Sequence, residues 1–127
     1  MKISYRVLSI SGALIWAGTV LLRGTTLMDN EIAKQILWRT PNFGAVWLSI
    51  GLFMVLYSHF LKKDFNEKYI YALIGAVLAC LLLSEILHVF TSNTSFDIWD
   101  MVASILAASI IAVIHLCKNI VQRNKIK

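Results

Sequence analysis

Residues 69–90 read YIYALIGAVLACLLLSEILHVF, and this stretch decides the fold class. From Tyr69 to Ser84 it contains no charged side chain. A helix of this length rises by about 1.5 Å per residue and matches the roughly 30 Å thickness of a bilayer's hydrocarbon core. The stretch therefore predicts a membrane-spanning helix.

Three further apolar runs, at about residues 7–22, 43–61 and 98–117, have similar lengths. Hydrophobic residues make up 58% of the chain, charged residues only 15%, and the mean hydropathy is +0.72. These values lie outside the range of ordinary soluble domains. A soluble helical bundle would also show a polar stripe on each helix, and residues 48–56 show almost none. We therefore predict an all-α, integral membrane four-helix bundle that forms one domain over residues 1–127.

The basic residues are distributed unevenly between the two sides that four spans would create. Arg23, Lys34 and Arg39 fall in the first connection, and the third connection has none. The other nine fall in the two tails or the second connection: Lys2, Arg6, Lys62, Lys63, Lys68, Lys118, Arg123, Lys125 and Lys127. The positive-inside rule then places both termini in the cytoplasm. The net charge of +5 is explained by this anchoring and indicates no nucleic-acid partner.

Two further expectations concern the lipid contacts of the chain. The basic C-terminal segment, residues 118–127, is suited to contact anionic lipid headgroups. In the first connection, Ile32, Ile36 and Trp38 recur near helical spacing, and Pro41 suits the first turn of the second span. We expect a short amphipathic helix before Pro41 that lies on the outward-facing surface of the membrane, with Trp38 at headgroup depth.

One stretch gathers ionisable side chains at membrane depth. Glu85 and His88 share a face of the third span, and Asp97, Asp100 and Ser104 form a stripe on the fourth. Because a short loop makes these spans antiparallel neighbours, the two polar faces can meet beneath the outer surface. These five residues are the candidate binding site, since ionisable groups in lipid are costly and usually functional.

Several interpretations of this polar cluster remain open. Structurally, Thr94 or Ser95 would cap the fourth helix, with Asp97 in its first turn near the positive dipole end. Capping does not explain Glu85 and Asp100, which favour a polar site or an interhelical hydrogen-bonded lock. Metal binding is chemically possible, but no tight ligand motif is present, so we expect no metal or cofactor. Catalysis would need an identifiable nucleophile, and the sequence names none.

The cluster resembles the C-terminal signature of the VanZ-like membrane protein family, over about one fifth of the chain. That signature reads approximately E-x-x-Q-x-F-x-x-x-R-x-x-D-x-x-D-x-x-A-N-x-x-G. The residues that match it at the expected spacing are Glu85, Phe90, Asp97, Asp100 and Ala103. Four positions depart from it: His88 replaces glutamine, Thr94 arginine, Ser104 asparagine and Ala107 glycine. The family's first motif, an Asp-Lys followed by His, is not visible at residues 41–47.

The resemblance implies a small bacterial membrane protein of four or five helices. It also implies a non-enzymatic cell-envelope role that affects susceptibility to the glycopeptide teicoplanin. The alternative is a small ion- or proton-coupled transporter in which the acidic cluster binds and releases a cation. A lipid-modifying enzyme is a third option.

Small residues recur every four positions on the fourth span, at Ser104, Ala108 and Ala112. Such a stripe lets another helix approach closely. We favour packing within the chain over a homodimer interface, which is the alternative. Cys80 and Cys117 lie at different depths of their spans, so we expect no disulfide between them.

Overall fold

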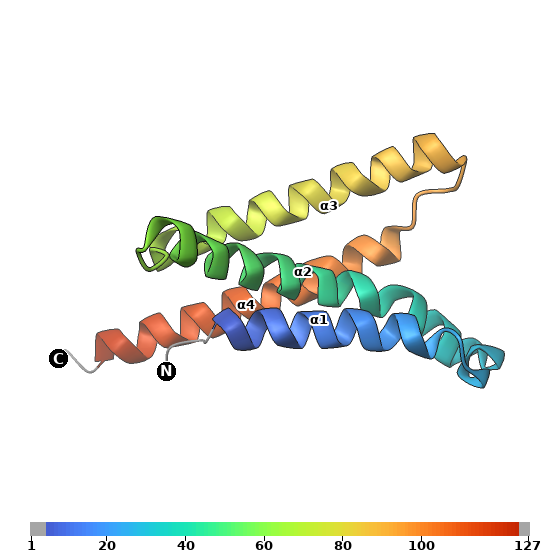
Figure 1. The fold of residues 1–127 in the computed structure, drawn as a ribbon, viewed down its shortest axis with the longest axis horizontal. Helices are drawn as coiled ribbons and strands as arrows, with labels where there is room; N and C mark the ends of the chain where they lie inside the picture. Colours follow the sequence, from blue (N-terminus) through green and yellow to red (C-terminus); the bar gives the residue numbers. More distant parts are fainter. Residues whose placement is uncertain (1–4, 125–127) are drawn as a thin grey trace.

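The computed structural model describes residues 5–124, apart from the side chains of Gln122 and Arg123. Within this range the chain forms four long helices (Figure 1): α1 (Tyr5–Leu22), α2 (Glu31–Leu61), α3 (Ile70–Ser92) and α4 (Ile98–Asn124). Two short 3-10 helices, η1 (Thr26–Asp29) and η2 (Glu67–Tyr69), lie in the first and second connections. The all-α prediction is confirmed for the part of the chain described.

Each long helix contains a segment long and apolar enough to cross a membrane, which marks a multi-pass membrane protein. Part of the predicted basic anchor lies outside the described residues, namely Lys2, Lys125, Lys127 and the side chain of Arg123. The fourth helix is longer than the expected span, which ended at Cys117, and it continues to Asn124.

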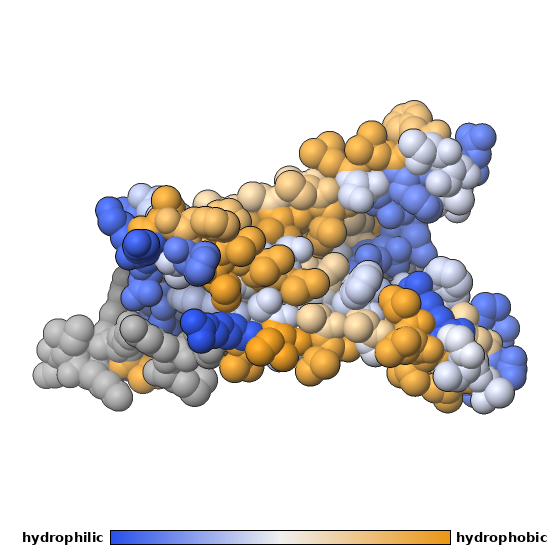
Figure 2. All heavy atoms as spheres, viewed as in Figure 1, coloured by the Kyte–Doolittle hydropathy of each residue, from blue (hydrophilic) through white to orange (hydrophobic). Residues whose placement is uncertain are grey.

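Burial follows the pattern of a protein that has lipid as its solvent. Val46, Ile50 and Met54 on α2 are fully buried, whereas Leu87 and Phe90 on α3 are 63% and 78% exposed. Figure 2 shows apolar atoms over much of the middle of the molecule and hydrophilic atoms gathered towards its two ends. Exposed apolar side chains on this scale would promote aggregation in water, whereas they are compatible with the hydrocarbon core of a membrane.

Glycines bring the backbones of α1 and α2 into direct contact. A Cβ atom at Gly12 would lie 2.7 Å from the carbonyl oxygen of Gly44 and 2.8 Å from Cα of Leu48. Gly51 is equally confined, because a Cβ there would lie 2.8 Å from Cα of Ser9. These are the small-residue contacts through which membrane helices gain close van der Waals packing. They fix α1 along α2 as an antiparallel pair (Figure 1).

Small residues also join α4 to α2. Ser104, Ala107 and Ala108 are almost completely buried, and the Trp47 indole N–H donates a hydrogen bond to the Ala107 carbonyl oxygen at 3.0 Å. This bond crosses between helices near the middle of both spans. Ser104 and Ala108 are therefore buried by packing within the chain, as favoured from the sequence.

The expected helix boundary at Pro41 is wrong. The segment before Pro41 is helical, but α2 begins at Glu31, where the Asn30 side chain caps it, and continues through Pro41 without a break. Proline has no N–H, so the carbonyl four residues earlier, at Leu37, loses its helical partner. The Arg23 Nε atom donates to this Leu37 oxygen at 3.0 Å, and Nη2 donates to the Trp38 oxygen at 3.0 Å. Arg23 thus supplies the donors that compensate for Pro41 inside α2, a helix about 46 Å long.

α3 contacts the other helices mainly near its first turns. Ile70, Leu73 and Ile74 are buried, whereas Leu81 and Glu85, further along the same face, are only half-buried. Figure 1 shows α3 diverging from α2 and α4 towards its C-terminal end. The divergence leaves an open notch between the end of α3 and the end of the bundle that holds the α1–α2 connection (Figures 1 and 2).

The glycine contacts predict a contrast between two substitutions on α1. Gly12→Ala should destabilise the protein by about 1–3 kcal/mol, because the added methyl forces the α1 and α2 backbones apart. Gly18→Ala should instead be neutral or stabilising by up to about 1 kcal/mol, because a Cβ there meets nothing within 4 Å and alanine favours helix. Thermal unfolding of both variants in detergent, followed by circular dichroism, tests this. Equal loss of stability in the two would contradict it.

Arg23 and Pro41 should be energetically coupled. Arg23→Met should cost about 1–3 kcal/mol, because it leaves the Leu37 carbonyl without a donor. In a Pro41→Ala background the cost should be smaller, because residue 41 then supplies an N–H to Leu37. A double-mutant cycle of unfolding free energies measures the coupling. Equal costs of Arg23→Met in both backgrounds would show that Arg23 does not compensate for the proline.

Candidate functional site

The sequence-predicted acidic residues converge where α3 ends and α4 begins. Glu85 lies on α3, Asp97 immediately precedes α4, and Asp100 lies in the first turn of α4. The Asp97 backbone N–H donates to Glu85 Oε1 at 3.4 Å. Three carboxylates of like charge are therefore held near one another across the α3–α4 connection.

The α3–α4 connection is built by its own polar side chains. Asn93 ends α3 in the left-handed conformation, with φ of 51°, which asparagine tolerates better than most residues. The cap of α4 differs from the expectation: Asp97 Oδ1, rather than Thr94 or Ser95, accepts from the Trp99 backbone N–H at 2.9 Å. Thr94 instead lies 3.4 Å from His88 Nδ1, which joins His88 to the connection. Asp97 thus has a structural role in addition to its charge.

Ser104 does not lie among the carboxylates. Its hydroxyl donates to the Asp100 backbone carbonyl at 2.9 Å, and its side chain is buried in the α2–α4 contact. Ser104 therefore supports the turn of α4 that carries Asp100.

Two α2 residues that sequence reasoning did not assign to the site complete it. Asn42 and Arg39 both face Asp100. The Arg39 guanidinium also lies 5.2 Å from the centre of the Trp99 ring, within range of a cation–π contact. We name Arg39, Asn42, Glu85, Asp97 and Asp100 the acidic-end cluster. Its three carboxylates and one guanidinium give it a net negative charge.

The arrangement of the acidic-end cluster suits binding. Carboxylates, an amide and one guanidinium can accept and donate hydrogen bonds to a polar or cationic group. Among residues 5–124, no three His, Cys, Asp or Glu side chains are grouped so as to hold a metal ion. Figure 2 shows hydrophilic atoms beside the notch that separates the end of α3 from the other helices.

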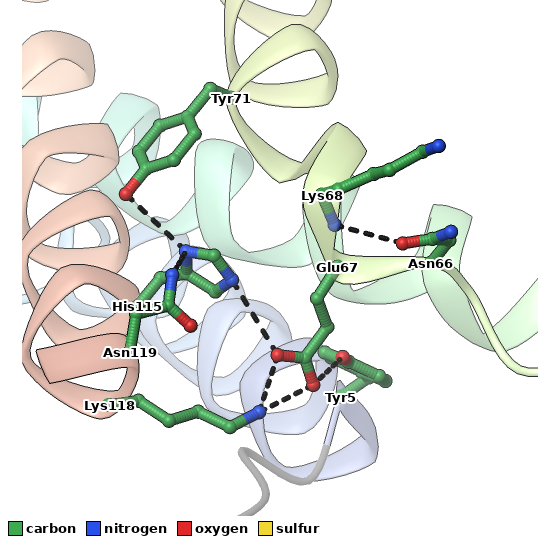
Figure 3. A network of polar contacts seen from close by, with 8 residues as sticks. All are labelled: Tyr5, Asn66, Glu67, Lys68, Tyr71, His115, Lys118 and Asn119. Carbon is green, nitrogen blue, oxygen red and sulfur yellow. Dashed lines mark hydrogen bonds and ion pairs between the residues drawn. The ribbon is translucent and has the colours of Figure 1, made fainter. Parts of the chain in front are cut away.

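A second polar cluster lies at the opposite end of the bundle, and Glu67 is its centre (Figure 3). The Tyr5 hydroxyl donates to Glu67 Oε1 at 3.0 Å, and Lys118 Nζ contacts both carboxylate oxygens. His115 Nε2 is 3.5 Å from Glu67 Oε2. Glu67, the first residue of η2 just before α3, thereby connects α1 and α4. We name Tyr5, Glu67, His115 and Lys118 the basic-end cluster.

His115 is the most buried member of the basic-end cluster, with 5% of its surface exposed. Its Nδ1 atom lies 3.4 Å from both the Tyr71 hydroxyl and Asn119 Nδ2. A proton on Nε2 would point to the Glu67 carboxylate and leave Nδ1 free to accept, so the surroundings favour that tautomer.

Sequence reasoning did not single out His115 or identify its partners. The available signal was the i, i+3 spacing of His115 and Lys118, which places both on one helix face. Their partner Glu67 comes from a distant connection, which no periodicity in the sequence indicates.

Comparison of the chain with protein-family models, with curated proteins and with solved structures found no match. What the protein does must therefore be inferred from its own residues.

The basic-end cluster predicts that Glu67→Gln lowers stability. Lys118, with 11% of its side chain exposed, would lose its anionic partner, and we expect a cost of about 1–3 kcal/mol after allowing for the partial exposure of Glu67. Glu31→Gln removes the same charge from an exposed pair with Lys34 and should change little. Thermal unfolding in detergent compares the two. An equal change in unfolding temperature in the two variants would show that Glu67 does not anchor the helices to one another.

Proposed function

We propose that this chain is a bacterial cytoplasmic-membrane protein that acts at the outer surface through its acidic-end cluster, in the manner of VanZ-like proteins. Its effect would be to reduce susceptibility of the cell envelope to lipophilic glycopeptides such as teicoplanin. The observation that carries the proposal is the convergence of Glu85, Asp97 and Asp100 from two helices. These are the acidic positions that match the family signature.

The orientation in this proposal follows from charge. Arg6, Lys62, Lys63, Lys68 and Lys118 all lie at the end of the bundle that holds the start of α1 and the α2–α3 connection. The positive-inside rule assigns that end to the cytoplasm and the acidic-end cluster to the outside. The first part of α2 then emerges at the outer surface, where the exposed side chains of Ile32, Ile36 and Trp38 would enter the interface.

Arg39 bears on the resemblance to VanZ-like proteins. The family signature has arginine where this chain has Thr94. Here Arg39, from a different helix, faces Asp100. A positive charge beside the acidic residues is therefore present, although the signature position lacks it, and this supports a shared use of the cluster.

The position of the cluster favours an outward binding site over a carrier. A carrier alternates access to a site near the bilayer midplane. Glu85 is about 10 Å from the end of α3 at 1.5 Å per residue, and Asp97 and Asp100 are closer to the end of the bundle. The proposal is accordingly one of binding without catalysis.

Expression in a teicoplanin-sensitive Gram-positive host tests the proposal. The wild-type chain should raise the teicoplanin inhibitory concentration severalfold, with vancomycin as the comparison drug. Asp100→Asn and Glu85→Gln should abolish the effect at matched membrane levels, as should Asp97→Asn, because asparagine preserves the helix cap. Glu31→Gln, an exposed acid in the first turn of α2, is the control and should retain it. No protection by the wild-type chain would reject this function.

A further inference from the structure

A cavity lies at the end of the bundle opposite the acidic-end cluster. It has a volume of about 720 Å³ and is open on one side. The start of α1, the last turns of α2 and the α2–α3 connection form its walls. This volume falls in the range of sites that hold small molecules or lipid headgroups.

The cavity is at the level where membrane spans meet the headgroup region. Tyr5 is the first residue of α1, and Ser58 and His59 precede the end of α2 by less than one turn. A phospholipid in the adjoining leaflet would carry its phosphate at this level. Its acyl chains would lie along the apolar surface of the helices.

The lining of the cavity changes from apolar to polar, as a phospholipid does from its acyl chains to its headgroup. Met54 and Phe65, both buried, line the apolar part. Edge-to-face contact with Tyr57, at 5.4 Å between ring centres, holds the Phe65 ring in place. Arg6 and His59 are exposed and supply donors at the polar part. The basic-end cluster fixes Tyr5, and with it the wall that α1 contributes.

The end of the bundle that holds the cavity has a net positive charge, which favours a phosphate there. Among the described residues at this end, five basic side chains accompany two acidic ones; Arg6 is the basic one that lines the cavity, and both acids, Asp64 and Glu67, line it too. Glu67 is already occupied by Lys118 and Tyr5. Asp64 remains to accept from a hydroxyl or ammonium group on the headgroup. An anionic phosphate beside Arg6 would gain charge-assisted hydrogen bonds.

We propose that this cavity binds the phosphate-bearing headgroup of one phospholipid, with Arg6 and His59 as its donors. The site is separate from the acidic-end cluster and does not depend on the function proposed for that cluster. It is also distinct from general attraction of the basic C-terminal segment to anionic lipid, because the residues that carry it belong to α1 and α2.

Thermal unfolding of the delipidated protein in a non-ionic detergent, followed by tryptophan fluorescence, tests the proposal. Dioctanoyl phosphatidylglycerol should raise the unfolding temperature in a saturable way. Dioctanoyl phosphatidylethanolamine in parallel shows whether the headgroup beyond the phosphate matters, and binding of either lipid supports the site. Dioctanoylglycerol, which lacks phosphate, should have no effect. Inorganic phosphate should act only weakly, because it lacks the acyl chains.

Two variants separate the cavity from the surrounding surface charge. Arg6→Gln should weaken the apparent affinity about tenfold. Lys63→Gln removes the same charge at the same end, but Lys63 does not line the cavity, so affinity should fall by less than twofold. Ser58→Leu adds bulk to the cavity wall and should also weaken binding, and unfolding without lipid verifies that each variant is folded. The proposal is overturned if Arg6→Gln and Lys63→Gln behave alike, or if dioctanoylglycerol or inorganic phosphate matches the phospholipid.

Discussion

The close contact between the backbones of α1 and α2 is the constraint on which the other features of this bundle depend. Lipid supplies no hydrophobic force between helices, so association relies on packing and on a few interhelical hydrogen bonds. Gly12, Gly44 and Gly51 provide the packing, since a side chain at any of them would collide with the facing backbone. With α1 seated on one face of α2, another face is left to α4, and both polar clusters take their positions from this arrangement.

The two polar clusters make different use of charge. In the basic-end cluster, Glu67 and Lys118 neutralise each other and His115 is enclosed, which suits an anchor. In the acidic-end cluster, carboxylates outnumber the single guanidinium of Arg39; Asp97 is exposed, and the other four side chains are half-buried. A neutral cluster around an enclosed histidine contributes to stability, whereas a charged and partly exposed one is available to a partner. The contrast supports placing the proposed function at the acidic end.

Hydropathy predicted the positions of all four long helices, because each is apolar over enough residues to span a membrane. The i, i+3 spacings and the short connection also predicted that Glu85, Asp97 and Asp100 lie near one another. Helix packing was not predictable in this way. Asn42 and Arg39 join the site only because α4 packs on α2, and Glu67 reaches Lys118 only because of where α3 begins. Pro41 was misjudged because its tolerance depends on Arg23, a residue on another segment.

The attachment of α3 at one end has a consequence for how the protein responds to its bilayer. Beyond Ile74 the helix has few protein neighbours, so in a bilayer most of its surface would face lipid. The tilt of a helix with so few neighbours is set by hydrophobic thickness to a larger extent than that of helices held by packing. Thinning or thickening of the membrane would therefore move Glu85 relative to Asp97 and Asp100. Bilayer composition becomes a determinant of the geometry of the acidic-end cluster.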